Sequence, residues 1–528
     1  MGLIDSALGL ARAAAGSVRL SFGAGLPLGE LTRVLGDRFG DRPAIAMPGR
    51  RMWTYAMLER EVARMAAALE AGGVRAGETV AVVCGNRPDI LVALFGLARI
   101  GAVPAPLNHR LRPEEQAAAL ESAGATAAVV DPELEPALLA LRLRLLRFEA
   151  LTGWMQRHPR EQRTQATRGA DPALLLATSG TTGQPKLARI PSRALLGAIG
   201  RFHALPVGHQ RGLRAGRDVV LAALPLTHVM GVTTMLGALC AGVKVLHLER
   251  FDARRVLARI EADEPNVFVG VPTMYADLES AGAAQRDLSS VELWVSAADA
   301  MPPDRARRFQ LYGALERVAG RRLGTAAFAD VYGMVELAGP AALRLYPPAP
   351  RGRELPAIGF VLPGFSARVV GADGKARRLF GEGELQLRGP GIFSGYVGAE
   401  PPAGAWFATG DVARLGPGGT FAFVGRSGDR LKVGGFSVFP AEVEAELRAF
   451  PGLAELAIVG VPDPRLGQVP AALVVASGGF DEQKFLAWAA DRVAGYRRPR
   501  SVVRVPSLPR GPNGKLDRRA AAALAQRS

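Results

Sequence analysis

Nine consecutive residues, at positions 178–186, carry the clearest chemical signal in this chain. They read Thr-Ser-Gly-Thr-Thr-Gly-Gln-Pro-Lys and directly follow the apolar run Leu-Leu-Leu-Ala at 174–177. The glycines let the backbone approach an anion closely, the hydroxyl groups add hydrogen-bond donors, and Lys186 brings a positive charge. The segment is not a Walker A loop, because Pro185 separates the glycine turn from the lysine and no Ser or Thr follows it. Such residues also make solvated linkers, but the preceding strand and the lysine favour a loop that binds phosphate.

The choice of basic residue supports this interpretation. The chain has 65 Lys and Arg residues, of which only six are lysines. Arginine therefore occupies almost every ordinary basic position, and a retained lysine indicates a place where a compact ammonium group suits better than a planar guanidinium. Three of the six, Lys186, Lys432 and Lys515, lie in segments with chemical character, although chance would also explain so small a number.

Four further segments hold side chains that can act on a nucleotide or an acid. His228 follows an apolar run, and residues 331–336, Val-Tyr-Gly-Met-Val-Glu, set an aromatic ring and a carboxylate around a glycine. That arrangement suits base stacking and a metal ion held against phosphate oxygens. We expect Asp411, in Thr-Gly-Asp, to lie on a tight turn facing ribose hydroxyls, and Lys515 to lie on a glycine-rich loop near the C-terminus, where mobile segments are common. Taken singly, the first three have a structural alternative: a core histidine, an ordinary turn and an Asx-turn, respectively.

The elements that must position these residues follow an α/β pattern. Short apolar runs at 78–83, 125–130, 243–246 and 267–270 alternate with helical patterns such as 89–95. This alternation predicts layered α/β units with parallel sheets. Closely spaced glycines and short alternating strands at 347–424 predict a β subdomain, and a helix opening at 439 followed by a strand at 454–461 predicts a small α+β unit at the C-terminus. With 528 residues, of which 48% are hydrophobic, the chain should form more than one domain.

Composition limits the other classes of function. The net charge is +16, but the arginines are scattered without interleaved aromatics, which argues against nucleic-acid binding. Cys84 and Cys240 lack metal or redox spacing and should be buried and reduced. The apolar stretch at 219–246 is interrupted by polar residues and glycines, so we expect a buried strand and helix instead of a membrane span. Residues 1–25 could form an amphipathic helix, and no secretory signal is evident, so we expect a cytoplasmic protein.

Together, in this order, these segments resemble the adenylate-forming superfamily of acyl-CoA synthetases, peptide-synthetase adenylation domains and luciferases. The likeness covers nearly the whole chain, including 50–69 and 85–108. It implies an N-terminal adenylation domain over 1–427, made of layered α/β subdomains plus a β subdomain, and a small mobile α+β lid over 428–528. It also implies two half-reactions, in which ATP and a carboxylate give an acyl-adenylate and pyrophosphate, and a thiol then displaces AMP.

The resemblance assigns roles to individual positions. Lys515, Lys186, Glu336 and His228 would be catalytic, with Lys515 stabilising charge as the carboxylate attacks the α-phosphate and His228 gating the acyl pocket. Glu336 and Thr181 would hold Mg²⁺. The nucleotide and cofactor contacts would come from Thr178, Ser179, Gly180, Thr181, Thr182, Gly183, Ala298, Asp330, Tyr332, Gly333, Asp411, Arg426, Lys432, Gly434 and Gly435. The acid would contact His228, Val229, Met230, Met274, Ala297 and Gly333.

This chain departs from the family pattern at several positions. Val335 stands where the family usually has a threonine that contacts the α-phosphate, and Leu187 replaces a usual glycine. The adenine-contacting segment 296–300, Ser-Ala-Ala-Asp-Ala, is less glycine-rich than in relatives, and the hinge position is Gly428, which can still rotate freely. Losing a neutral hydrogen bond costs about 0.5–1.5 kcal/mol, so adenylation would be slowed but not abolished.

The leading hypothesis is therefore an AMP-forming ligase that activates an aromatic or medium aliphatic acid and transfers it to coenzyme A, with ATP and Mg²⁺. Amino-acid activation is disfavoured, because no aspartate occurs at 227–230. The alternatives are a ligase that loads a carrier protein, a diazotase that couples nitrite to an arylamine, and a nucleotide-binding homologue without catalysis. A homodimer is also compatible with the sequence.

Overall fold

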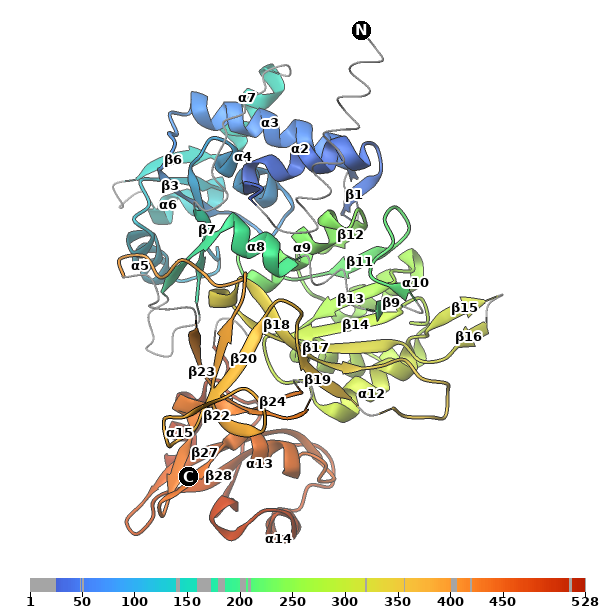
Figure 1. The fold of residues 1–528 in the computed structure, drawn as a ribbon, viewed down its shortest axis with the longest axis vertical. Helices are drawn as coiled ribbons and strands as arrows, with labels where there is room; N and C mark the ends of the chain where they lie inside the picture. Colours follow the sequence, from blue (N-terminus) through green and yellow to red (C-terminus); the bar gives the residue numbers. More distant parts are fainter. Residues whose placement is uncertain are drawn as a thin grey trace. The chain divides into compact units, whose positions relative to one another are not determined.

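The computed structural model describes residues 25–527, apart from positions 48, 50–51, 139–142, 159–171, 179–185, 200–205, 208–209, 319–320, 356, 400–405, 418–419 and 512–514. Figure 1 shows the chain with its elements labelled. It divides into two units. Unit 1 comprises Met1–Ile358, Leu362–Phe365 and Gly389–Ala403, and unit 2 comprises Gly359–Val361, Ser366–Arg388 and Gly404–Ser528.

The largest sheet of unit 1 is mostly parallel. Its strands run in the order β18-β17-β14-β13-β11-β12-β1-β2, and only β18 and β2 are antiparallel to their neighbours. The bounds are β1 (Pro43–Ala46), β2 (Trp53–Thr54), β11 (Val219–Ala222), β12 (Lys244–His247), β13 (Val267–Gly270), β14 (Leu293–Ala297), β17 (Ala327–Met334) and β18 (Gly339–Tyr346). Continuous apolar runs form the central strands because both faces are covered; every residue of β13 is buried.

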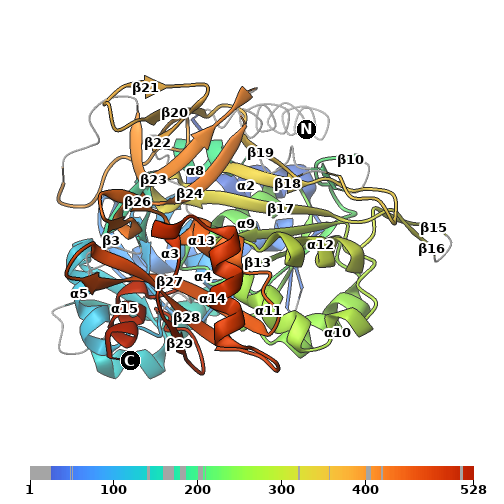
Figure 2. The same cartoon turned by 90° about the horizontal axis from the view of Figure 1, so that it is seen from below.

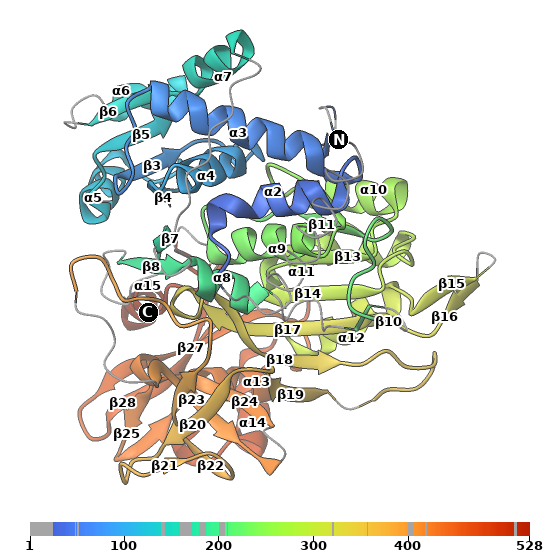
Figure 3. The ribbon, with the colours of Figure 1, turned by 45° about the horizontal axis from the view of Figure 1, so that its top comes forward.

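Helices form the crossovers between these parallel strands, as such connections require. They are α9 (Val229–Cys240), α10 (Ala253–Asp263), α11 (Pro272–Ser280) and α12 (Pro303–Tyr312). Figure 3 shows them beside the strands β11, β13, β14 and β17. Beneath them lies a core rich in aromatic rings, in which Tyr275 is within 6.2 Å, centroid to centroid, of Phe268, Trp294, Phe309 and Phe328.

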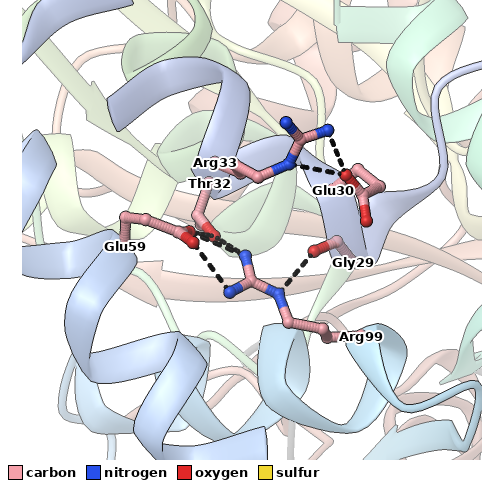
Figure 4. Close-up of polar contacts among 6 residues, drawn as sticks. All are labelled: Gly29, Glu30, Thr32, Arg33, Glu59 and Arg99. Carbon is pink, nitrogen blue, oxygen red and sulfur yellow. Dashed lines mark hydrogen bonds and ion pairs between the residues drawn. The ribbon is translucent and has the colours of Figure 1, made fainter. Parts of the chain in front are cut away.

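A second, fully parallel sheet in unit 1 has the order β4-β3-β5-β6. Its strands are β3 (Thr79–Val83), β4 (Val103–Pro106), β5 (Ala127–Val130) and β6 (Arg144–Arg147). Helices α2 (Leu28–Phe39), α3 (Tyr55–Ala71) and α4 (Asp89–Arg99) pack on one another near it (Figure 3). Arg99, fully buried, joins all three helices: it donates to Gly29 O at 3.0 Å, to Thr32 Oγ1 at 2.9 Å and to both carboxylate oxygens of Glu59 at 2.8 and 2.7 Å (Figure 4).

The remaining elements of unit 1 are short. They are α5 (Pro113–Ala123), η1 (Pro132–Leu134), α6 (Glu135–Leu138), α7 (Phe148–Arg157), β7 (Pro172–Ala177), β8 (Leu187–Pro191), α8 (Ser192–Ile199), β9 (Pro206–Val207), β10 (Gln210–Arg211), η3 (Ala283–Gln285), β15 (Glu316–Val318), β16 (Arg321–Leu323) and η4 (Val335–Leu337). Strand β19 (Ile358–Val361) contains the division between the units.

Unit 2 contains two sheets, and Figure 2 labels most of their strands. One is antiparallel with the order β21-β20-β22-β23-β24, and the other has the order β26-β25-β28-β27 with β29 parallel to β28. The bounds are β20 (Ser366–Val370), β21 (Ala376–Arg377), β22 (Gly381–Arg388), β23 (Phe407–Leu415), β24 (Phe421–Arg426), η6 (Ser427–Asp429), β25 (Leu431–Val433), β26 (Phe436–Val438), α13 (Pro440–Leu447), β27 (Leu453–Asp463), β28 (Gly467–Ala476), α14 (Glu482–Arg492), η7 (Gly495–Arg497), β29 (Val502–Arg504) and α15 (Arg518–Arg527).

The predicted α/β class is confirmed, and the expected strands at 78–83, 125–130, 243–246 and 267–270 appear as β3, β5, β12 and β13. Cys84 and Cys240 are free and buried, as predicted. The apolar stretch at 219–246 forms β11, α9 and part of β12, and the described helices include none long and apolar enough to cross a bilayer. The expected N-terminal helix lies outside the described residues, and the domain boundary at 427/428 stays a prediction.

Candidate functional site

The carboxyl ends of four parallel strands meet at one edge of the large sheet of unit 1. The register pairs Ala222 of β11 with Val269 of β13, and Gly270 with Ser296 of β14. Ala297 then pairs with a residue of β17. Ligands of open α/β sheets bind at this kind of edge. The predicted acid-contacting residues lie at these four strand ends or shortly after them. The topology therefore brings together segments that are up to about a hundred positions apart in the sequence.

The segment that carries His228 is held by a side chain that the sequence analysis did not single out. Asn86, just after β3, donates to the carbonyl oxygens of Leu224 at 3.2 Å and Glu249 at 3.0 Å, and its Oδ1 accepts from the Leu226 N–H at 2.9 Å. His228 itself is the residue before the first turn of α9 and is partly exposed. Asn86 therefore fixes the backbone that positions the histidine. The signal available in the sequence was an amide side chain in a turn directly after a strand.

The first turn of α9 explains why Val229 and Met230 are candidates for the acid site. Both are partly exposed, whereas Val232 through Cys240 are buried. A Cβ on Gly231 would lie 2.0 Å from the Pro225 carbonyl oxygen, so only glycine allows this close approach. The helix therefore begins tightly against the preceding loop and presents its first residues at the sheet edge. Met274, in the first turn of α11, is also partly exposed.

The end of β14 has an unusual backbone. Ala298 adopts a φ of +76° although it is not glycine, in the left-handed region where a Cβ is unfavourable. Ala297 is partly exposed and Ala298 is exposed. This is the segment in which the sequence departs from the more glycine-rich family pattern, and the structure shows that the backbone keeps a conformation suited to glycine.

A β-bulge shapes the end of β17. The register shifts between Tyr332 and Gly333, and a Cβ on Gly333 would lie 2.1 Å from the Gly339 carbonyl oxygen of β18. A bulge re-aims the residues that follow it. The chain then enters η4, which carries Glu336, and Tyr332 and Glu336 are both partly exposed. The predicted glycine turn is therefore a bulged strand end that runs into one turn of 3₁₀ helix.

The predicted phosphate loop joins two antiparallel strands, β7 and β8. The Thr178 N–H donates to the Lys186 carbonyl oxygen at 2.8 Å, and this bond closes the hairpin at the base of the loop. Strand β7 confirms the expected strand before the loop. Thr178 is buried and Lys186 is exposed, while residues 179–185, including Ser179, Gly180, Thr181, Thr182 and Gly183, lie outside the described part of the chain.

Tyr396 is a residue that sequence reasoning missed. Its hydroxyl donates to Glu336 Oε1 at 2.8 Å, and the Lys186 Nζ lies 5.4 Å from the centroid of its ring. Burial, reinforced by the Glu336 carboxylate, raises the pKa of Tyr396 well above its usual value, so the hydroxyl remains a donor. The tyrosine reaches this place because its segment pairs with β8: the Val397 N–H donates to Leu187 O at 2.8 Å. We refer to Lys186, Tyr396 and Glu336 as the phosphate-side cluster.

Asp330, a predicted nucleotide contact, lies on β17 with its carboxylate largely buried. The Arg344 guanidinium donates to Asp330 Oδ2 and to the Met301 carbonyl oxygen, both at 2.8 Å. Burial raises the pKa of Asp330 to about 6, and the nearby Arg344 charge opposes this shift. The carboxylate thus has an internal partner, and its role toward a nucleotide stays a prediction.

Asp411 and Arg426 are neighbours in unit 2. They face each other across β23 and β24, with Arg426 Nε 3.5 Å from Asp411 Oδ1. The expectation that Asp411 lies on a tight turn is wrong: residues 409–411 belong to β23, where the pairing with β22 is irregular and Gly410 has a φ of +73°. The Thr409 hydroxyl accepts from the Asp411 N–H at 3.1 Å, so a bulged strand replaces the turn.

The predicted lid residues lie on two separate hairpins of unit 2. Lys432 is exposed on β25, and Gly434 and Gly435, with φ of +55° and +90°, form the two-residue turn between β25 and β26. Positive φ at both turn positions favours glycine. Lys515 is partly exposed on a loop that the Gly511 N–H closes by donating to the Lys515 carbonyl oxygen at 2.8 Å.

The Lys515 loop is anchored by the first residue of α15. Arg518 donates to Glu444 Oε1 and to the Ile458 carbonyl oxygen, both at 2.8 Å, and its Nε lies 3.2 Å from Asp429 Oδ2. Glu444 is buried and also accepts from the Ile458 N–H at 2.8 Å. Arg518 therefore ties the segment after Lys515 to α13 and to η6, and it is a second positioning residue that the sequence analysis missed.

The donor set of the phosphate-side cluster fits a magnesium ion that arrives with a nucleotide. Among the described residues no three His, Cys, Asp or Glu side chains gather as a self-sufficient metal site. Mg²⁺, however, is commonly held by one or two carboxylates together with substrate phosphates. Glu336 offers such a carboxylate, because Tyr396 occupies only one of its oxygens and Lys186 supplies a charge for the phosphates.

Comparison with known proteins agrees with this geometry. The family model described as AMP-binding enzyme matches residues 33–397, and that described as AMP-binding enzyme C-terminal domain matches residues 442–515. Feruloyl-CoA synthase of an Amycolatopsis species is 35% identical, covering 88% of this chain and 92% of its own length. Indoleacetate–CoA ligase of Aromatoleum aromaticum is 31% identical, covering 90% and 93%. The crystal structure of an anthranilate CoA ligase in complex with anthranoyl-AMP superposes with a TM-score of 0.81 at 25% identity, covering 95% and 98%.

Proposed function

The chain belongs to the AMP-binding enzyme family, and from this premise we propose that it joins an aromatic carboxylic acid to coenzyme A with conversion of ATP to AMP and pyrophosphate. The prediction of an ATP-dependent, AMP-forming acid–CoA ligase is confirmed by the family model and by relatives that are acyl- and aryl-CoA ligases. The aromatic class of the acid and the roles of individual residues are the proposal.

The observation that supports the residue roles best is the phosphate-side cluster at the base of the β7–β8 loop. Lys186 lies at the end of that loop, and Tyr396 links it to Glu336 through a ring contact and a hydrogen bond. A triphosphate bound along the loop would meet the ammonium group of Lys186. Glu336 would hold Mg²⁺, which supplies positive charge to the phosphate oxygens when bound, and the Tyr396 hydrogen bond keeps the carboxylate oriented.

In the first half-reaction a carboxylate oxygen of the acid attacks the α-phosphorus of ATP. The bond between the α-phosphorus and the bridging oxygen to the β-phosphate breaks, and pyrophosphate leaves. Lys515 would stabilise the negative charge that develops at the α-phosphate, and Lys186 the charge on the leaving phosphates. Asp411, beside Arg426, would accept hydrogen bonds from the ribose hydroxyls, and Tyr332 would stack on adenine.

In the second half-reaction the thiolate of coenzyme A attacks the carbonyl carbon of the acyl-adenylate. The carbon–oxygen bond to AMP breaks, and AMP leaves as the thioester forms. The hairpin that carries Lys432, Gly434 and Gly435 would enter the site in this step, because its two-glycine turn has no side chains to obstruct a pantetheine arm. His228 would open or close the path between the acid and the incoming thiol.

An aromatic acid is favoured over an aliphatic one by two observations. Val229, Met230, Met274 and Ala297 are partly exposed at the strand edge and offer apolar, largely unbranched surface, which suits a flat ring. In addition, the names of the two relatives that are more than 30% identical and compared above refer to feruloyl and indoleacetate substrates. These acids are those proteins' own, and for this chain we infer only the aromatic class.

The test is release of pyrophosphate and AMP by the purified protein with ATP and Mg²⁺ across cinnamic, benzoic, indolic and medium aliphatic acids, with and without coenzyme A. We expect the highest kcat/KM with an aromatic acid, formation of its CoA thioester, and loss of both in Lys515→Ala. A preference for aliphatic acids would overturn the aromatic class. Two alternatives are tested in parallel: nitrite with an arylamine, and a phosphopantetheinylated carrier protein in place of coenzyme A. Turnover with only one of these would assign the enzyme to that reaction.

A further inference from the structure

Three arginines surround one tryptophan on the antiparallel sheet of unit 2. The guanidinium carbon of Arg368 lies 4.5 Å from the Trp406 ring centroid, that of Arg388 5.3 Å and that of Arg378 5.4 Å. The residues come from β20, from the end of β22, from the segment after β21 and from the position before β23. We refer to these four residues as the arginine–tryptophan cluster.

The strand register places this cluster on the outer face of the sheet. Arg368 pairs with Gln386, and Arg388 pairs with Ser366, so Arg368 and Arg388 lie on the same face of neighbouring strands. The alternating residues Val369, Leu385 and Leu387 point to the opposite face and are fully buried. Figure 2 shows β21, β20, β22 and β23 side by side in this sheet. The cluster is therefore a feature of the sheet's solvent-facing side and not of its core.

The three positive charges are not neutralised within the described residues. No ion pair joins Arg368, Arg378 or Arg388 to a carboxylate, although most nearby arginines have one: Arg377 pairs with Asp373 at 2.5 Å and Arg414 with Glu382 at 2.6 Å. Arg368 instead donates to the neutral Gln386 side chain at 2.8 Å. Like charges that gather around one ring with no carboxylate partner in the described part of the chain repel each other, and a bound anion would relieve this repulsion.

Two large apolar side chains stand next to the cluster. Leu379 and Phe380 follow Arg378 directly in the loop between β21 and β22 and are 55% and 69% exposed, and Phe380 is the most exposed large apolar side chain of the described residues. Phe380 also adopts a φ of +49°. A bulky residue at positive φ is strained, and such strain is a reason to look for function. Here the strained backbone holds a phenylalanine in water.

We propose that this loop and the arginine–tryptophan cluster form a docking site for an anionic phospholipid bilayer. Leu379 and Phe380 would enter the boundary between headgroups and acyl chains, Trp406 would lie at the headgroup level, and the three arginines would contact lipid phosphates. The net charge of +16 would attract the protein to such a surface. This site is independent of the proposed ligase activity and would bring the enzyme to the phase in which apolar acids concentrate.

A bilayer explains the combination of features better than a soluble polyanion does. A nucleic acid or a phosphorylated metabolite would use the arginines and the indole ring, but it would leave Leu379 and Phe380 in water. A bilayer would contact the arginine–tryptophan cluster and the two apolar side chains together, because it offers anionic headgroups and an apolar interior a few ångströms apart. The two apolar side chains therefore decide between these partners.

The experiment is co-sedimentation of the full chain with vesicles of phosphatidylcholine alone and with about 30% phosphatidylglycerol. One variant combines Arg368→Gln, Arg378→Gln and Arg388→Gln, and another combines Leu379→Ser and Phe380→Ser. Arg414→Gln is the matched control for charge, since Arg414 lies in the same sheet but is paired with Glu382. Leu323→Ser is the matched control for apolar exposure, since Leu323 is 46% exposed on β16.

We expect binding to the anionic vesicles only, weakened by salt. The partition coefficient should fall about fivefold for each arginine removed and about tenfold in the Leu379→Ser and Phe380→Ser variant, while both controls stay within about twofold. Thermal melting and turnover of a water-soluble acid should be unchanged in all variants. Equal binding by the parent and all variants would overturn the proposal, because the protein would then bind vesicles through another part of the chain. So would loss with the arginine variant alone, because the site would then be a basic surface for soluble polyanions.

Discussion

Replacement of Tyr396 by phenylalanine tests the phosphate-side cluster most directly. The hydroxyl of Tyr396 donates to Glu336 at 2.8 Å, and the ring lies under Lys186. Phenylalanine keeps the ring and removes only the donor, so Tyr396→Phe isolates the hydrogen bond. Tyr396→Leu removes the ring contact as well. Comparing the two variants separates the orientation of Glu336 from the support of Lys186.

The expected loss of adenylation activity in each variant follows from the type of contact that the substitution removes. A hydrogen bond to a charged group contributes about 1.5–3 kcal/mol, and partial exposure of Glu336 places this one toward the lower value. A contribution of about 1.5 kcal/mol corresponds to roughly a tenfold change in rate. The cation–π contact of the exposed Lys186 contributes about 0.5–1 kcal/mol, or about two- to fivefold. We therefore expect kcat/KM for adenylation to fall about tenfold in Tyr396→Phe and a further two- to fivefold in Tyr396→Leu.

The assay is pyrophosphate release with ATP, Mg²⁺ and the acid each varied in turn while the other two are at saturation. If Tyr396 orients the carboxylate that holds Mg²⁺, Tyr396→Phe should raise the KM for Mg²⁺ more than that for the acid. Tyr312→Phe is the control, since Tyr312 ends α12 at the opposite edge of the sheet. A Tyr396→Phe enzyme within twofold of the parent would refute the reasoning, and so would a uniform loss of kcat with an unchanged Mg²⁺ requirement.

Four further predictions concern other parts of the chain. Lys515→Ala should lower the rate of adenylation by about 10²–10³-fold yet leave thioester formation from added acyl-adenylate within a few-fold, as measured by stopped-flow with coenzyme A. Asp330 has a pKa of about 6 when folded against 3.8 when unfolded and so binds its proton more tightly in the folded state, which should increase its contribution to stability by about 1 kcal/mol from pH 7 to pH 5; denaturant unfolding at the two pH values should show this gain in the parent and not in Asp330→Asn. Arg99→Ala should lower the free energy of unfolding by about 3 kcal/mol, because it leaves Glu59 without its buried partner; a loss below 1 kcal/mol would mean that the network contributes little. Ala298→Gly should raise the free energy of unfolding by about 0.5–1 kcal/mol, since relief of the strain at φ +76° exceeds the added chain entropy, and an unchanged melting curve would contradict this.

The parts of the fold that the sequence predicted well are those with local signals. Strand β13 matches its predicted bounds because a short continuous apolar run between turn residues, within an alternating α/β pattern, is typical of a strand buried on both faces. The strand before Lys186, β7, is confirmed for the same reason, whereas the phosphate loop itself lies outside the described residues and stays a prediction. The family resemblance then supplied the order of the domains.

Some residues of the candidate site could not be predicted from the sequence, because their contacts join segments that are far apart in the chain. Tyr396 is 60 residues from Glu336 and reaches it only because its segment pairs with β8. Asn86 is 138 residues from Leu224, and Arg518 is 74 residues from Glu444. None of these partners is visible in a local pattern, because each depends on a register between distant segments. The turn expected at Asp411 failed for a similar reason: the pairing of β23 with β22 on one side and β24 on the other turns a local Thr-Gly-Asp signal into a bulged strand.

The backbone at the strand ends argues that the site was shaped for a ligand and is not a remnant. Two glycine-demanding features persist there, the close approach of Gly333 to Gly339 and the positive φ of Ala298. A site without function would be expected to lose the positive φ of Ala298, because a relaxed backbone at this residue would remove roughly 1–2 kcal/mol of strain. Its retention despite an alanine, together with the contacts that join Lys186, Tyr396 and Glu336, supports the proposal of an adenylation site over that of a decayed nucleotide-binding homologue.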